Sequence, residues 1–238
     1  QFGRTGSSPG TYKTFDPVGE LYYESLRYIQ GLSPTAQATS GMTDAMKDGF
    51  PVYSTWIDPH ATGSSTGDYS CLKNNILLIG DVNTHNDKSI PGNTSRLADS
   101  EFSRTASLAA NEPDFTAWTR VVDSFETNNN SVNYTNAQGT FAARNPNITA
   151  SNGLRGLQTL DTGATRASFY MAGMAYWANT NDIRGTNWSD TAKRRPGMRA
   201  TTYVLDVNEF ARQSDPTMRR NSQFFLTAKY GGFVDRSN

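Results

Sequence analysis

The chain has 238 residues, in which 22 basic side chains balance 22 acidic ones, so its formal net charge is zero. No long run of one charge sign occurs, which argues against nucleic acid or an anionic membrane as a partner. The longest apolar runs are a few residues, far short of the length that a transmembrane helix needs. The chain is long enough to bury a core as one large domain or two small ones.

Cysteine usage and the amino terminus bear on where the protein works. The single cysteine, Cys71, has no internal disulfide partner. It is either a small buried hydrophobic residue or the partner of a cysteine outside this sequence. Residues 1–10 lack the apolar region of a signal peptide and an initiator Met, which predicts a processed product or a fragment. The abundance of Asn, Ser and Thr favours a secreted or surface-exposed bacterial protein.

The first predicted helix covers residues 17–32, where apolar residues recur at helical spacing. Asp16 is placed to cap it, Pro17 suits its first turn, and Gly31 is the expected end. Residues 33–70 are rich in Gly, Ser, Thr and Pro, which predicts a long loop with one short strand in the aromatic segment 50–57.

A buried strand is predicted over residues 75–80, and it is followed directly by Asp81. An acid at this position lies at the carboxyl end of a strand, the edge where open α/β sheets bind ligands and metals. Asp81 is therefore the leading candidate for a functional residue, although an Asp that opens a surface turn gives the same pattern. His85 and Asp87 lie in the polar loop 82–100 and are either additional ligands or solvated loop residues.

The rest of the chain alternates between helices and one further strand. In chain order we expect a helix within 101–126, a long loop or insertion over 127–162, a helix over 165–179, a strand over 200–207, and a helix over 222–229 that stops at Gly231–Gly232. This order indicates an α/β fold with a parallel sheet and covering helices. Only two core strands are recognisable, which is few for such a fold.

Five segments, in order along the chain, resemble the PilY/PilC family of type IV pilus biogenesis factors and tip-associated adhesins. They are residues 11–31, the Cys-x-x-Asn strand 71–81, the helix end 175–184, the strand 201–207 and the final helix with its Gly-Gly-Phe turn, 225–235. Each motif alone is weak, but five in order are fairly specific. We therefore treat the chain as resembling this family over about a third of its residues.

The resemblance implies a von Willebrand factor A-like domain, an open, doubly wound and mostly parallel sheet with covering helices, over residues 1–238. Residues 33–70 and 127–162 would be inserted loops. Such a domain can carry a metal-dependent adhesion site, here Asp81 with Thr14 or Asp16 holding Mg²⁺ or Ca²⁺. The sequence departs from the family pattern, because no Asp-x-Ser-x-Ser loop occurs and the first strand is missing.

The implied function is a non-enzymatic adhesion or assembly module at the tip of a type IV pilus, outside the cell and reached through the periplasm. Its partners would be minor pilins or other pilus-tip proteins, and a host or surface ligand. The alternatives are a structural scaffold of the tip complex without a working metal site and a metal-assisted hydrolase using Asp81 and His85. The hydrolase is disfavoured because no catalytic motif accompanies these residues.

Side chains outside the predicted edge have less specific interpretations. The basic pairs Arg194–Arg195 and Arg219–Arg220 are expected on the solvated surface. The aromatic residues of the predicted helices are expected mainly in the core. Those of segment 50–57 fit a binding surface and ordinary packing equally well.

Overall fold

The fold is mixed α/β, and the computed structural model describes residues 17–80, 90, 112–127, 133–135, 141–143, 169–207 and 222–232. The longer helices are α1 (Val18–Ile29), α4 (Phe115–Thr127), α6 (Tyr170–Thr180) and α8 (Gln223–Gly232). The strands are β1 (Lys73–Gly80), β2 (Asn133–Thr135), β3 (Phe141–Ala143) and β4 (Arg199–Asp206). The helices and strands predicted from periodicity and present in this set therefore form within a few residues of their expected bounds.

Helix α1 follows the amphipathic pattern of its sequence. Tyr22 and Leu26 are buried on one side, whereas Leu21 faces solvent. The helix ends as predicted, because Gly31 adopts a left-handed backbone with φ of +68°, which glycine tolerates without a Cβ penalty. At the other end Pro17 is the N-cap residue instead of a first-turn residue, and it supplies no side-chain cap.

Strands β1 and β4 pair in parallel, as predicted, from Lys73 opposite Arg199 to Gly80 opposite Asp206. A parallel pair needs a long crossover, and here the chain passes through α4 and α6 between the two strands. Alternate residues of both strands point to a buried face, which carries Ile76, Leu78, Ala200 and Thr202. Within the described residues this parallel sheet has two strands, β1 and β4. Two strands do not establish the von Willebrand factor A-like fold that the sequence resemblance implied.

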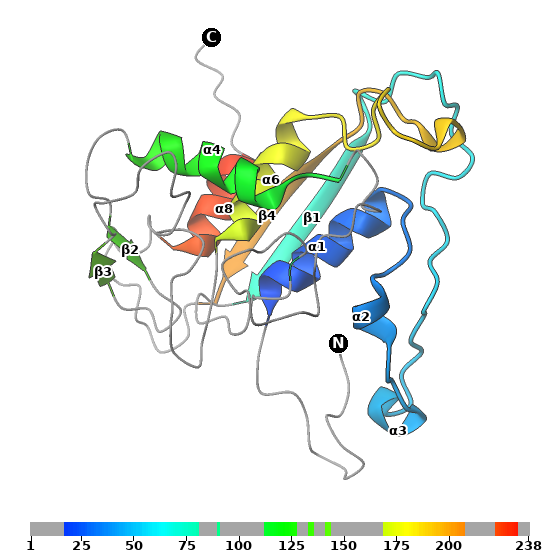
Figure 1. The fold of residues 1–238 in the computed structure, drawn as a ribbon, viewed down its shortest axis with the longest axis horizontal. Helices are drawn as coiled ribbons and strands as arrows, with labels where there is room; N and C mark the ends of the chain where they lie inside the picture. Colours follow the sequence, from blue (N-terminus) through cyan, green and yellow to red (C-terminus); the bar gives the residue numbers. More distant parts are fainter. Residues whose placement is uncertain are drawn as a thin grey trace.

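Helices cover one face of the sheet, the buried face (Figure 1). Helices α1, α6 and α8 contact the strands, and α4 packs against the outer side of α6. A buried hydrogen bond of 2.6 Å joins the Tyr22 hydroxyl of α1 to the Thr202 hydroxyl of β4. Burial and this bond fix α1 against the sheet.

The helices approach closely where glycine faces a neighbouring backbone. A Cβ on Gly173 of α6 would lie 2.8 Å from the Cα of Thr119 in α4. A Cβ on Gly231 of α8 would lie 2.7 Å from the Cβ atoms of both Ala175 and Thr202. Gly173 and Ala175 of α6 therefore permit close packing against α4 and α8.

Two sequence predictions differ from the structure in detail, and a third agrees with it. Segment 50–57 forms no strand, and the predicted loop instead carries two short helices, α2 (Ala36–Thr39) and α3 (Asp44–Lys47), each capped by a threonine side chain. The insertion 127–162 contains the antiparallel pair β2–β3. Helix α8 ends at Gly232, which confirms the helix end predicted at Gly231–Gly232.

None of the helices in the described part of the chain has the length and apolar character that a membrane span requires.

Candidate functional site

The predicted metal ligands cannot be placed at the carboxyl edge of the sheet, because Asp81, Thr14 and Asp16 all lie outside the described residues. His85 and Asp87 lie outside them as well. What the structure does show is the end of the strands, where the Val207 N–H donates a hydrogen bond of 2.8 Å to the Gly80 carbonyl. The metal site therefore stays a prediction.

A search for three or more His, Cys, Asp or Glu side chains close enough to hold a metal ion finds none within the described ranges. This result does not reach the predicted ligands, because none of them was among the residues searched. The chemistry of Asp81 remains an expectation from the sequence.

The outer face of the β1–β4 sheet is apolar and open to solvent. More than half of each of five large apolar side chains is exposed: Leu77, Ile79, Tyr203, Leu205 and Val207. Parallel sheets are normally covered on both faces, because their strands carry apolar residues on both sides. Exposed apolar patches are typical of interaction sites, so this face is a candidate for one.

Charge is confined to the amino end of the same face. Lys73 and Arg199 are paired in register there and are exposed. Their side chains alternate in phase with Leu77 and Tyr203, because residues two apart on a strand share a face. The outer face therefore runs from two basic groups at its amino end to apolar side chains at its carboxyl end.

The segment 33–70, predicted as an inserted loop, displays a second group of exposed apolar side chains. Phe50 and Tyr53 are more than half exposed, and Ile57 is 87% exposed. Trp56 is partly covered, and its ring meets Tyr28 of α1 edge-on at 5.7 Å. Of the two readings left open for segment 50–57, the structure excludes ordinary core packing for these three residues.

Directly after Ile57 the loop is fixed to the body of the protein by an ion pair. Both Asp58 carboxylate oxygens accept hydrogen bonds from the guanidinium of Arg184, at 2.9 and 2.7 Å. The Arg184 side chain is fully buried and that of Asp58 is 13% exposed. The pair joins residues 126 positions apart in the sequence.

The electrostatics of this anchor follow from its surroundings. Burial alone would raise the pKa of Asp58, but the hydrogen bonds from Arg184 and the His60 backbone N–H hold that pKa below its ordinary value. Burial lowers the pKa of His60, opposed by the hydrogen bond from its Nε2 to Asn74 Oδ1 at 3.0 Å. Arg195 completes the anchor by donating from Nη2 to the His60 carbonyl at 2.6 Å.

Two interpretations from the sequence are wrong here. Arg195 is buried rather than solvated, because its guanidinium donates hydrogen bonds to the backbone carbonyls of His60 and Ala192. Cys71 is exposed rather than buried, because it lies in the turn before β1, outside the alternation that buries the strand residues. No pattern in the sequence marked Arg195 or Asp58 as partners of other residues.

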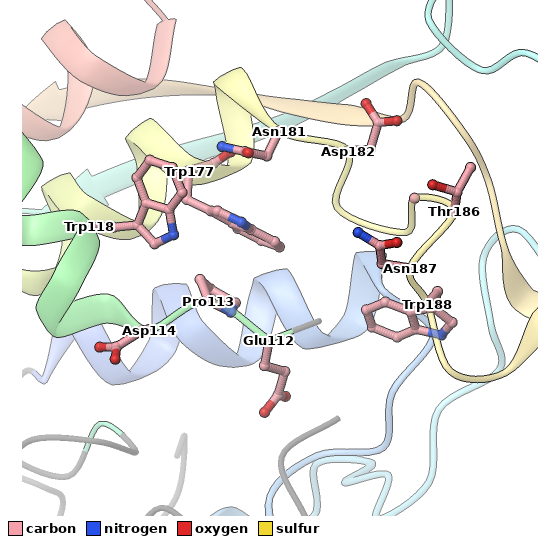
Figure 2. A pocket seen from close by; sticks show the side chains of 11 residues that line it. Glu112, Pro113, Asp114, Trp118, Trp177, Asn181, Asp182, Thr186, Asn187 and Trp188 are labelled. Carbon is pink, nitrogen blue, oxygen red and sulfur yellow. The ribbon is translucent and has the colours of Figure 1, made fainter. Parts of the chain in front are cut away.

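A pocket of about 500 Å³ lies where α4 begins and α6 ends. Figure 2 shows Trp118 and Trp177 on one side, Trp188 on the other, and Glu112 and Pro113 along the floor. The sequence analysis did not single out this group, because its members come from three separate segments. Of the described residues that line the pocket, none has a basic side chain.

The comparisons with known proteins decide the family. The family described as "PilY1 homolog, second domain" matches residues 5–178, nearly three quarters of the chain. The chain belongs to the PilY1 homolog family. It is also 30% identical over 226 residues to the type IV pilus biogenesis factor PilY1 homolog of Xylella fastidiosa, a match that covers 93% of this chain.

This match covers 16% of the length of the Xylella protein. No solved structure matches the chain. Membership of the PilY1 homolog family supports a role associated with type IV pili, which agrees with the resemblance noted in the sequence. The family match does not identify the partners, a ligand or the location in the cell.

Proposed function

We propose that this part of a PilY1 homolog is a non-enzymatic assembly or adhesion module of a type IV pilus, working outside the cell at the pilus tip. It binds a protein partner, a minor pilin or another tip protein, through the outer face of the β1–β4 sheet, next to the carboxyl edge predicted as the binding edge. The observation that carries the proposal is the row of apolar side chains exposed on that face.

The chemistry of the face indicates the complementary surface. Leu77, Tyr203 and Leu205 offer apolar area, which drives association when it is removed from water. Lys73 and Arg199 at the amino end favour a partner with an acidic group beside its apolar patch. The exposed segment 50–57 is a second contact, held in place by the Asp58–Arg184 pair.

The test uses purified minor pilins and the full-length protein with Leu77→Asp or Tyr203→Asp. A charge in the centre of an apolar contact has to be desolvated without a partner, so we expect at least a tenfold loss of affinity by calorimetry. Leu21→Asp is the matched control, because Leu21 is similarly exposed but lies on α1. Equal binding by all three variants would contradict the proposal.

A scaffold role is the second candidate, favoured by the 16% share of the Xylella relative that the chain spans. In that case another part of the longer polypeptide covers the outer face. Tyr203→Asp would then lower the melting temperature of the full-length protein and leave its affinity for pilins unchanged. Docking of a separate partner predicts the reverse pattern.

A metal ion forms a separate part of the proposal. Mg²⁺ or Ca²⁺ held by Asp81, with Thr14 or Asp16, would stabilise the folded chain by binding to it alone. We expect a higher melting temperature with either ion than with EDTA, and loss of the difference in Asp81→Ala. Equal melting temperatures in EDTA and in both ions would favour the scaffold without a working metal site.

A further inference from the structure

The pocket between α4, α6 and the segment that follows α6 has the chemistry of a ligand site. Its volume of about 500 Å³ is within the range of small-molecule sites in proteins. It lies beside Asp182 and Gly185, close to where the Ile183 N–H bonds the Met198 carbonyl just before β4 begins. It is therefore at the amino end of β4, away from the carboxyl edge.

The aromatic walls of the pocket are fixed in place. Trp177 and Trp188 are almost completely buried, and Trp118 is half-buried with its ring 5.8 Å from that of Tyr176. Trp177 and Trp188 are therefore fixed walls, and Trp118 is the one of the three tryptophans whose ring is partly exposed and able to contact a ligand. Figure 2 shows the indoles of Trp118 and Trp177 facing the space across from Trp188.

Each carboxylate around the pocket already has a partner in the protein. Glu112 forms an ion pair with Arg27. Asp114 Oδ1 accepts the Ala117 N–H at 3.0 Å, within the first turn of α4. Asp182 Oδ2 accepts the Gly197 N–H at 2.9 Å. The ion pair neutralises Glu112, which weakens the case for a cationic ligand. The described residues that line the pocket include no Lys or Arg, so the carboxylates disfavour an anionic ligand.

The remaining polar groups are neutral and suit hydroxyl groups. The Asn181 amide nitrogen donates to the Trp177 carbonyl at 3.3 Å and to the Thr180 hydroxyl at 3.0 Å, which leaves its oxygen as an acceptor. Among the described residues, the side chains of Thr186 and Asn187 have no hydrogen-bond partner. Figure 2 places Asn187 between the tryptophans. An amide and a hydroxyl both donate and accept.

We propose that this pocket binds an uncharged sugar ring. Its C–H face packs on the partly exposed indole of Trp118, and its hydroxyl groups pair with Asn181, Thr186 and Asn187. The inference goes beyond pilus assembly and does not depend on the outer face of the sheet. Its test uses no pilus protein, so failure of either proposal leaves the other standing.

The test titrates the 238-residue chain with the methyl glycosides of glucose, galactose and N-acetylglucosamine, and follows tryptophan fluorescence. Three of the chain's four tryptophans line the pocket, so binding there changes the signal directly. We expect saturation by at least one glycoside. Asn187→Ala should weaken that binding at least tenfold at unchanged melting temperature, whereas Asn75→Ala, on the outer face of β1, should leave it unchanged.

Three results would overturn the proposal. The first is a fluorescence signal that does not saturate with any of the three glycosides, which are titrated to about 50 times the protein concentration and then on to their solubility limit. The second is glycoside binding that Asn187→Ala does not weaken, because the ligand then lies elsewhere. The third is saturation by tetramethylammonium alone, because the pocket would then select a cation over the indoles.

Discussion

Replacing Asp58 by Asn should destabilise the protein by about 3 kcal/mol, because it leaves the buried Arg184 guanidinium without a counter-charge. Removing one partner of a buried pair costs roughly 3–5 kcal/mol, and we take the low end because the Asp58 side chain is 13% exposed and water can reach the site. With a urea dependence of about 2 kcal/mol per molar, the unfolding midpoint should fall by about 1.5 M. Equilibrium urea unfolding followed by circular dichroism measures this shift.

The chain contains a matched control in Asp44, whose ion pair with Lys47 has the same 2.7 Å separation but a 97% exposed carboxylate. Asp44→Asn should cost less than about 1 kcal/mol, because exposed pairs contribute little. Arg184→Met combined with Asp58→Asn should cost clearly less than the two single changes added together. An Asp58→Asn loss no larger than that of Asp44→Asn would refute the reasoning.

The pH dependence of stability tests the same Asp58–Arg184 pair. Because the pKa of Asp58 is lower in the folded protein than in the unfolded chain, the unfolded state takes up the proton first as the pH falls. The stability that the pair contributes is therefore present above about pH 4, the unfolded value, and is lost as the pH falls through the folded pKa. Asp58→Asn should flatten this part of the profile.

Three further changes test the packing and the anchor. Gly31→Ala should cost about 1–3 kcal/mol in urea unfolding, because φ is +68° and the new Cβ would lie 2.7 Å from the Asp58 carboxylate; a neutral result would contradict this geometry. Gly173→Ala should cost about 1–3 kcal/mol despite the better helix propensity of alanine, since the Thr119 backbone blocks the Cβ, and a rise in melting temperature would count against that contact. The pKa of His60 is lowered in the folded state, so the free energy of unfolding should fall as the pH drops below about 6.5. His60→Gln should remove this pH dependence, and an identical pH dependence in the variant would assign it to other groups.

The elements of the fold could be predicted because their signals are local. A short apolar run within 75–80 and the segment 200–207, rich in Thr, Tyr and Val, indicated the strands, and Gly31 marked the end of the first helix. The sequence could not show that the apolar residues Leu77 and Ile79 face solvent, because a continuous apolar run is typical of a strand buried on both faces. Which face is covered depends on helices distant in the sequence.

The candidate sites were less predictable, because they join residues far apart in the chain. Asp58 and Arg184 are separated by 126 positions, and no sequence pattern around either residue predicts their ion pair. The tryptophan pocket draws Trp118 and Trp188 from different segments. Asp81 carries a recognisable local pattern, but it lies outside the described residues, so its role stays a prediction.

The most direct test of the central claim is a photo-crosslinking amino acid placed at position 203 of the full-length protein in piliated cells. Docking through the outer face predicts a crosslink to an identified minor pilin or tip protein, with none from the same group at position 21 on α1. Crosslinks to pilins that are equal at both positions, or that are absent at 203, would contradict the account. A crosslink at 203 within the same polypeptide would support the scaffold in its place.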